Sequence, residues 1–594
     1  MNNNNGVIDK AWALLQKKRP EYELPSSPPS NRCFNILFSV PENTLGVPRK
    51  VAIEIQWGLH FPYDEVEAFS KDELLTGFPH QMAENGKLCL ERSIQDISDD
   101  SLLFRTVEGV ENWLNAMATN TLFKEGDVYE LPDFGYLDRY RNEVVKDKLF
   151  YLEDERRYAQ LLPHLNNIGR CKLVYSKMPN VLVPREFSVG SWTGEKINDI
   201  PFTLCSPDCK SVDAAWVLLS SIIVERYRPP KSWAELYALT DKYCIFEFRK
   251  LVRELWENAK ETAYLLIGWP IPDKVGGDNK TIAWCACAFQ GEGSVRKTRK
   301  IDFRAFGKHR SKAGDLWQLS EPGGNLDAQL HWMSCENISY RNYTSRWKLD
   351  DSIVNKNILL VGCGAIGSEV AEVLVRGGQK ALCLIDKERV EFGNLCRHVA
   401  SAALVGLYKT EALKWWLSLV NPMSRINSCP VAFIGDEEFI PKNDEYDLLL
   451  DCTANDKIMR TLAKGSRNAG IPYVKFFINP TAEYLTMIIS GTCIRGDEVL
   501  SKLLEVITLN DNINASEYYG YGEGLSVMAP GCWHPTYPGR WVNIKILIGM
   551  AIEILEGRLK SGIGSDGFGA VIGHSINDAG LPETRVVYAG EFAR

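Results

Sequence analysis

Alternation of apolar and polar residues marks the first 150 positions of the chain. In C-F-N-I-L-F-S-V (residues 33–40) and V-A-I-E-I-Q-W (51–57) every second side chain is apolar, which predicts two strands that each bury one face. Further on, V-E-G-V-E-N-W-L-N-A-M (107–117) repeats apolar residues three and four positions apart, which predicts an amphipathic helix. Residues 1–150 are therefore expected to form an α+β domain.

The centre of the chain combines a long helical period with two continuous apolar runs. Residues 232–260 carry apolar positions at helical spacing, whereas Y-L-L-I-G-W-P (264–270) and T-I-A-W-C-A-C-A-F (281–289) are almost entirely apolar. Runs of this length predict strands that are buried on both faces. We therefore expect residues 151–340 to be a folded α/β connector.

Short apolar runs that stop at a glycine loop or at a carboxylate dominate the carboxy-terminal part. The three clearest are I-L-L-V before a glycine loop, L-C-L-I before Asp386, and D-L-L-L before Asp451. Apolar strands that alternate with helical segments are typical of an open parallel α/β sheet. We therefore expect a Rossmann-like domain over residues 341–594, and a multidomain α/β protein overall.

Composition places the chain among large globular proteins. Its 594 residues are enough for three domains, and 45% hydrophobic with 24% charged residues excludes a disordered chain. A net charge of -8 and a pI near 5.7 argue against general nucleic-acid binding. The basic run at residues 294–312 is expected to be solvated surface.

The cysteines and the apolar segments indicate a cytoplasmic protein. Sixteen cysteines without regular spacing indicate reduced thiols, and M-N-N-N-N-G lacks the regions of a signal peptide. The apolar stretch 541–555 contains Asn543, Lys545 and Glu553, so we expect an amphipathic helix and no membrane span. Four cysteines in apolar runs are expected to be inert core thiols: Cys363, Cys383, Cys396 and Cys452.

A glycine loop and the acidic residue after it indicate a nucleotide site. Gly362, Gly364 and Gly367 allow a tight turn from strand to helix, so that backbone N–H groups face phosphate. Asp386 follows Gly367 by 19 residues at a strand tip, where its carboxylate can accept ribose hydroxyls. A dinucleotide fold would account for these residues alone.

The polar residues downstream favour ATP over a dinucleotide. Arg397 and Lys409 are cations that can neutralise a triphosphate, and Asn394 can donate to the same oxygens. Asp451, at the carboxyl end of its strand, is expected to be a magnesium ligand. Together these residues indicate attack on an α-phosphate.

The motifs G-C-G-A-I-G, Asp386-x7-Asn394-x2-Arg397, Lys409 and D-C-T-A-N resemble the adenylation domain of the ThiF/MoeB and ubiquitin-activating enzyme superfamily. The resemblance implies that ATP and Mg²⁺ convert a protein's C-terminal carboxylate into an acyl-adenylate. That superfamily usually has an acidic residue where this chain has Ala454. Many of its members carry C-x-x-C zinc knuckles, and this sequence has none, so a structural zinc is not expected.

An acyl-adenylate needs an acceptor, and a thiolate is the usual one because a thioester stays activated. Cys532 in A-P-G-C-W-H-P-T-Y-P-G occupies a loop broken by proline and glycine. His534, two residues on, can lower the pKa of the Cys532 thiol. The alternative for Cys532 is a structural role as a small buried residue in a turn. If Cys532 is not the acceptor, Cys493 is the other candidate.

A second thiol lies near the amino terminus. The segment N-G-K-L-C-L around Cys89 resembles the signature of ubiquitin-conjugating enzymes, which ends at the acceptor cysteine. Phe78-Pro79-His80 stands where that signature has H-P-N, so the resemblance implies that His80 replaces the asparagine that stabilises the oxyanion. An ordinary cysteine buried in a strand is the alternative for Cys89.

A conjugating-type domain, a connector and an activating domain on one chain resemble the fused enzymes of bacterial CBASS antiphage systems. The resemblance implies that the C-terminus of a cGAS/DncV-like nucleotidyltransferase passes through Cys532 and Cys89 to a lysine of a target protein. It also implies a homodimer through the adenylation domain, with Arg341 or Arg346 reaching across.

Two other functions stay open at this level. In a ThiF-like sulfur-transfer or small-molecule adenylating enzyme, Cys532 would carry a persulfide and Cys89 would be incidental. In a non-catalytic scaffold the nucleotide pocket would only sense ATP, but such a scaffold need not retain Arg397, Lys409 and Asp451.

Overall fold

The computed structural model describes most of the chain in two compact units. The described residues are 4–72, 75, 77–82, 85–90, 100–132, 147–176, 178–190, 194–197, 209–221, 230–245, 247–291, 326–431, 445–509, 518 and 539–594. One unit comprises Met1–Ile200 with Cys205–Ser339, and the other comprises Pro201–Leu204 with Tyr340–Arg594. None of the helices in these residues is both long enough and apolar enough to cross a membrane.

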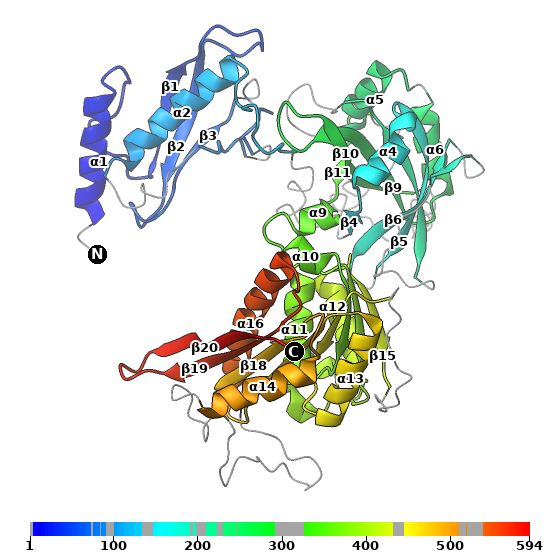
Figure 1. The fold of residues 1–594 in the computed structure, drawn as a ribbon. Coiled ribbons are helices and arrows are strands. Elements are labelled where there is room, and N and C mark those ends of the chain that lie inside the picture. The colour runs from blue at the N-terminus through cyan, green and yellow to red at the C-terminus, as the bar shows by residue number, and fades with distance from the viewer. Residues whose placement is uncertain are drawn as a thin grey trace, which may run out of the picture. The chain divides into compact units, whose positions relative to one another are not determined.

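The amino-terminal region is a small antiparallel sheet with two helices (Figure 1). Its elements are α1 (Asn4–Lys18), β1 (Cys33–Ser39), β2 (Lys50–Trp57), β3 (Val66–Ser70) and α2 (Leu102–Ala118). The alternating residues predicted for β1 and β2 do point into one core, where Ile36 is opposite Ile53. The strand and helix predictions for this region are therefore confirmed.

The connector is built on one mixed sheet, in the order β11-β10-β9-β8-β5-β6-β4-β12, with β7 paired to β6. Its strands are β4 (Lys148–Tyr151), β5 (Asn167–Tyr175), β6 (Val181–Val189), β7 (Lys196–Ile197), β8 (Ser211–Leu218), β9 (Thr262–Pro272), β10 (Asn279–Gln290), β11 (His331–Trp332) and β12 (Cys335–Asn337). Its helices are α4 (Glu155–Leu161), η3 (Leu162–His164), α5 (Trp233–Lys242) and α6 (Phe248–Asn258).

Both faces of the connector sheet are covered, which explains its unbroken apolar runs. On β9, Leu265 and Ile267 belong to the core under α5 and α6, whereas Tyr264 and Leu266 belong to the core on the opposite face. The two predicted strands are β9 and β10. The helical pattern predicted for residues 232–260 is present as two helices, because the chain breaks between α5 and α6.

The second unit is an eight-stranded sheet in the described residues, ordered β15-β14-β13-β16-β17-β18-β19-β20. Its strands are β13 (Asn357–Val361), β14 (Ala381–Ile385), β15 (Arg425–Cys429), β16 (Leu448–Asp451), β17 (Tyr473–Ile478), β18 (Tyr484–Ile489), β19 (Gly567–Ile576) and β20 (Pro582–Phe592). The first five strands in that order are parallel, and the remaining three are antiparallel.

Helices cover both faces of this sheet (Figure 1). They are α9 (Tyr340–Tyr343), α10 (Asp351–Val354), α11 (Ala365–Arg376), η4 (Phe392–Cys396), η5 (Ala402–Leu404), α12 (Lys409–Val420), α13 (Asp456–Ala469), α14 (Gly496–Leu509) and α16 (Trp541–Ser561). Leu360 packs in the core under α11, α12 and α16, and its neighbour Leu359 packs under α13 and α14. The predicted Rossmann-like sheet is confirmed, and ligands of such sheets bind outside the carboxyl ends of the strands.

Candidate active site

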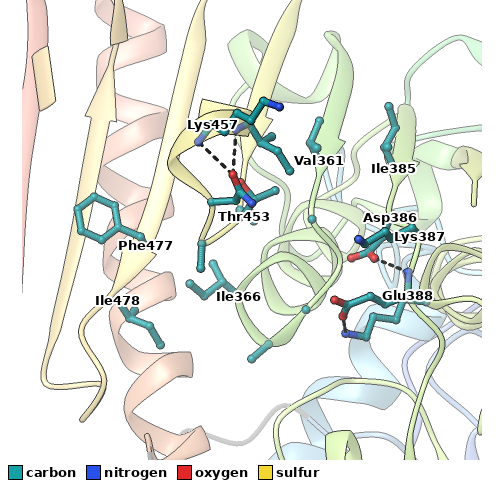
Figure 2. Close-up of a pocket in the computed structure, with 18 of the residues that line it drawn as sticks. Val361, Ile366, Ile385, Asp386, Lys387, Glu388, Thr453, Lys457, Phe477 and Ile478 are labelled. Atoms are coloured by element: carbon teal, nitrogen blue, oxygen red, sulfur yellow. Dashed lines mark hydrogen bonds and ion pairs between the residues drawn. The ribbon is translucent and has the colours of Figure 1, made fainter. Parts of the chain in front are cut away.

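A pocket of about 740 Å³ lies at the carboxyl ends of β13, β14, β16 and β17. Figure 2 shows Asp386, Lys387 and Glu388 on one side of it and Thr453 and Lys457 on another. Its wall includes the first residues of three helices, α11, α12 and α13. Helix N-termini present free N–H groups and a partial positive charge, so the pocket is built to receive an anion.

The glycine turn forms the floor between β13 and α11. Gly362 has φ +89°, and a Cβ there would lie 2.9 Å from Thr453 Cγ2. Gly364 is the N-cap of α11 and has open space beside it. A Cβ on Gly367 would lie 1.8 Å from Gly362 O. Gly362 and Gly364 line the pocket as predicted, while Gly367 allows the helix to approach the turn.

Asp386 connects the glycine turn to the end of β14. Its Oδ2 accepts from Cys363 N at 2.7 Å, and its Oδ1 accepts from Glu388 N at 2.8 Å. A carboxylate has about four acceptor sites, so two of them stay available on a side chain that lines the pocket. The geometry therefore suits the predicted contact with ribose hydroxyls.

Three lysines give the pocket wall its positive charge. Lys409 is largely buried, and its Nζ lies 2.6 Å from Glu388 Oε2. Lys387 and Lys457 also line the pocket, and our reading of the sequence missed both. Their positions in the sequence could have identified them, because Lys387 directly follows Asp386 and Lys457 lies in the first turn of α13. Three cations beside the N-termini of α11, α12 and α13 suit a polyphosphate.

Asn394 and Arg397 are not among the described residues of the pocket wall. Asn394 Oδ1 accepts from Glu391 N at 3.0 Å and so caps the short helix η4. Arg397 is the half-buried residue after that helix. Contact of either side chain with phosphate stays a prediction.

His398 is a further residue that our reading of the sequence missed. Its Nδ1 accepts from Ala400 N at 3.0 Å, so its Nε2 donates to Cys363 O at 2.9 Å. Burial lowers the pKa of His398 to about 4, because the neutral ring is the form that suits this site. His398 therefore connects the segment of Arg397 to the glycine turn.

Asp451, the predicted magnesium ligand, does not line the pocket within the described residues. Its side chain is fully buried, and its two oxygens accept from four donors on Thr453, Tyr473 and Lys475. Within the described residues Ala454 and Asn455 line the pocket at this strand end, and Asp451 does not. No group of three metal-ligating side chains occurs there either. The Asp451 side chain as placed does not fit a magnesium site.

Cys89 lies beyond β3 in a turn that depends on Gly86. A Cβ on Gly86 would lie 1.9 Å from Ser70 O, and Leu88 N donates to Ala68 O at 2.9 Å. Cys89 itself is exposed and outside the strands, which contradicts the alternative of an ordinary buried strand cysteine. Partial burial raises the pKa of its thiol, Lys87 lowers it, and Glu130 raises it further.

His80 supports this turn through its backbone and is held by a later segment. Cys89 N donates to His80 O at 2.7 Å. The His80 ring places Nε2 3.1 Å from Leu122 O and Nδ1 3.3 Å from Glu130 Oε2. Since both nitrogens already have partners, the oxyanion role of His80 stays a prediction that requires one of them to be released.

Residues 122–130, which we call the strap, also pair with the β9–β10 hairpin of the connector. Gly126 N donates to Val275 O at 3.0 Å, Val275 N donates to Asp127 O at 2.9 Å, and Tyr129 N donates to Asp273 O at 3.1 Å. The connector is therefore tied by main-chain bonds to the segment that holds His80.

The remaining predicted residues give a mixed picture. Cys532 and His534 lie outside the described residues. Cys493 is exposed, and so are the side chains of Arg341 and Arg346. Among the predicted core thiols, Cys396 is exposed, so that prediction is wrong for it, while the other three are buried.

Comparison with known proteins adds family assignments to this geometry. Residues 341–497 match the ThiF family, and residues 120–338 match the Cap2 central linker domain. The ATP-dependent ubiquitin transferase-like protein Cap2 of Enterobacter hormaechei subsp. hoffmannii (strain UCI 50) is 24% identical over 572 residues, which are 91% of this chain and 89% of that protein. The resemblance to the ThiF family and to the CBASS proteins is thereby confirmed, whereas the resemblance of the segment around Cys89 to ubiquitin-conjugating enzymes stays a prediction.

Two further matches cover only part of the chain. The adenylyltransferase and sulfurtransferase uba4 of Ogataea parapolymorpha is 30% identical over 26% of this chain, which spans 35% of that protein. A crystal structure of Escherichia coli MccB with AMPCPP and MccA matches with a TM-score of 0.28 and 16% identity, over 41% of this chain and 65% of MccB.

Proposed function

We propose that this chain, which matches the Cap2 central linker domain and the ThiF family, uses ATP to activate the C-terminus of another protein and to transfer it through thioesters. One observation supports this most strongly. The pocket joins a glycine turn, the carboxylate of Asp386, three lysines and the N-termini of α11 and α13. A triphosphate nucleotide uses all of these features together.

The first step is the formation of an acyl-adenylate in this pocket. A carboxylate oxygen of the partner's C-terminus attacks the α-phosphorus of ATP, the bond to the β-phosphate breaks, and pyrophosphate leaves. Lys387, Lys409 and Lys457 line the pocket and stabilise the charge that develops on the phosphates. Asp386 orients the nucleotide through its ribose.

Thioester transfer follows the adenylation. We propose that the thiolate of Cys532 attacks the acyl carbon, releases AMP and takes up the acyl group. Exchange with Cys89 then restores the Cys532 thiol, and a lysine amine of the target attacks the Cys89 thioester to give an amide and a free thiol. The exposure of Cys89 supports its part in this sequence.

The partner and the assembly are proposed on the same basis. We propose a cGAS/DncV-like nucleotidyltransferase as the protein whose C-terminus is activated, in an antiviral defence system, with a homodimer through the adenylation domain. The similarity to an ATP-dependent ubiquitin transferase-like protein over 91% of the chain supports a protein as the partner. Magnesium accompanies the ATP phosphates in this proposal, and none of the steps relies on Asp451.

The test is to incubate the chain with Mg-ATP and the candidate nucleotidyltransferase and to measure pyrophosphate exchange and thiol-sensitive adducts on non-reducing gels. We expect exchange, and an adduct that is lost in Cys532→Ala and accumulates on Cys532 in Cys89→Ala. Absence of pyrophosphate exchange with an authentic partner would overturn the proposal.

Sulfur transfer is the second candidate, and it is favoured by one observation, the similarity to an adenylyltransferase and sulfurtransferase over a quarter of the chain. In that case the chain would adenylate its substrate and Cys532 would carry a persulfide. Cys89→Ala would then leave pyrophosphate exchange and adduct formation unchanged. The Cap2 central linker domain and the exposed Cys89 favour ligation instead.

A further inference from the structure

The end of β16 carries a buried ion pair that the adenylation chemistry does not use. Asp451 and Lys475 are almost completely buried, and Lys475 Nζ lies 3.1 Å from Asp451 Oδ2. Tyr473 Oη donates to the same oxygen at 2.6 Å. A buried lysine needs a nearby anion, because an unpaired charge away from water is costly. Asp451 supplies that anion.

The Asp451–Lys475 pair also holds Thr453, the first residue of the turn 453–455 that lines the pocket. Asp451 Oδ1 accepts from Thr453 N at 2.8 Å and from Thr453 Oγ1 at 2.7 Å. Lys475 Nζ donates to Thr453 O at 2.8 Å. The three polar atoms of Thr453 are thus all held by the two charged side chains.

The fixed turn is part of the pocket wall. Thr453, Ala454 and Asn455 all line the pocket, and Asn455 Oδ1 accepts from Lys457 N at 3.0 Å and Ile458 N at 3.1 Å. Thr453 Cγ2 is also the atom that closes the space beside Gly362. Thr453 therefore lies against the glycine turn on one side and leads through Ala454 and Asn455 into the start of α13 on the other.

We infer that Asp451 is the buried counter-ion of Lys475, and that the pair positions residues 453–455 against the nucleotide's phosphates instead of Asp451 binding magnesium. This rests on the proposed nucleotide function. An Asp451 whose acceptor sites are filled by four donors has none left for a metal. Burial and the neighbouring Asp451 raise the pKa of Tyr473 well above its usual value, so this residue stays a donor.

The test compares Asp451→Asn with the double variant Asp451→Asn/Lys475→Met, using thermal unfolding and titrations of a fluorescent ATP analogue and of Mg²⁺. Asp451→Asn leaves a buried cation without its anion, so we expect a lower Tm and about a tenfold weaker half-saturation for the nucleotide. The half-saturation for Mg²⁺ should change by less than about twofold. Lys475→Met removes the unpaired positive charge. The double variant should therefore recover most of the lost Tm and most of the lost nucleotide affinity.

A milder variant keeps the test decisive if Asp451→Asn does not fold. Tyr473→Phe removes one donor and keeps the ring, so we expect a folded protein with about a two- to threefold weaker nucleotide half-saturation and unchanged Mg²⁺ dependence. Asp386→Asn is the matched control, because its carboxylate also belongs to the site but does not contact Lys475. Adding Lys475→Met to Asp386→Asn should restore nothing.

Two results would overturn the inference. One is a Mg²⁺ half-saturation at least about tenfold weaker in Asp451→Asn with nucleotide affinity unchanged at saturating Mg²⁺. The other is a double variant that is no more stable than Asp451→Asn. Thermal unfolding without nucleotide reports on the pair even if no protein tail is ever activated, so failure of the proposed function is distinguishable from failure of this inference.

Discussion

The nucleotide pocket and the Cys89 site are assembled in different ways. The pocket collects side chains from the ends of neighbouring parallel strands, all between Val361 and Pro480. The Cys89 site depends on the strap, which starts more than 30 residues after Cys89 and is paired with a hairpin of the connector. Each motif of the first site lies at one strand end and can be recognised by itself, whereas the second site also depends on a hairpin of another part of the chain, which no motif near Cys89 announces.

The largest expected effect is on the nucleotide pocket. It tests whether the pocket depends on the local geometry of the glycine turn. Gly367→Ala would put a Cβ 1.8 Å from Gly362 O, so we expect a loss of about 3 kcal/mol in the stability of the second unit and loss of nucleotide binding. Calorimetry and an ATP-analogue titration measure both.

Gly364→Ala is the matched control, because it has open space beside it and a φ of -80°. It should change stability by no more than about 0.5 kcal/mol. Equal effects of the two substitutions would show that close packing of α11 on the turn is not what constrains the loop.

An intermediate effect separates the two sites by pH. The folded pKa of His398, about 4, lies below the usual value near 6.5, so the unfolded chain binds the proton first as pH falls. Stability is therefore complete above about pH 6.5 and declines towards pH 4, by about 2 kcal/mol between pH 7 and pH 5.

Hydrogen exchange around β13 and α11 at both pH values measures this decline. The decline should be absent in His398→Asn, and exchange at residues 85–90 should not follow it. A pH dependence that persists in His398→Asn would contradict the assignment to this imidazole.

The smallest expected effect is on the thiol side and tests its dependence on the connector. Val275→Pro removes the N–H that donates to Asp127 O, which should weaken the strap by about 1 kcal/mol. We expect discharge of a Cys89 thioester to an amine to slow about fivefold, with pyrophosphate exchange unchanged.

Lys274→Ala, which keeps the main chain intact, is the control for this substitution. It should leave discharge of the Cys89 thioester at the rate of the unmodified protein. If Val275→Pro discharged Cys89 at that rate too, the connector would have no part in this site.

Several features of the fold and the site could be predicted because they are local. The alternation of apolar and polar residues predicted β1 and β2. Continuous apolar runs predicted β9, β10 and the sheet of the second unit. Gly362, Gly364, Asp386 and Lys409 could be found in sequence order because successive strand ends of a parallel sheet meet at one edge.

The remainder depends on side-chain direction and on distant contacts. At the end of β16 the sequence offers Asp451 and Ala454, and only the fold shows that the first is buried and the second lines the pocket. The break between α5 and α6, where Cys244 has φ +57°, overrides a continuous helical pattern. The contact of His80 with the strap has no local signal at all.

The pairing of the strap with the β9–β10 hairpin has an evolutionary consequence. It is made by main-chain N–H and C=O groups, which every residue except proline supplies in full. Mutations can therefore change the side chains of the strap and of the hairpin without breaking the hydrogen bonds between them. Descendants of this protein are free to diversify the surface there while inheriting the same main-chain link between the connector and the segment that holds His80 beside Cys89.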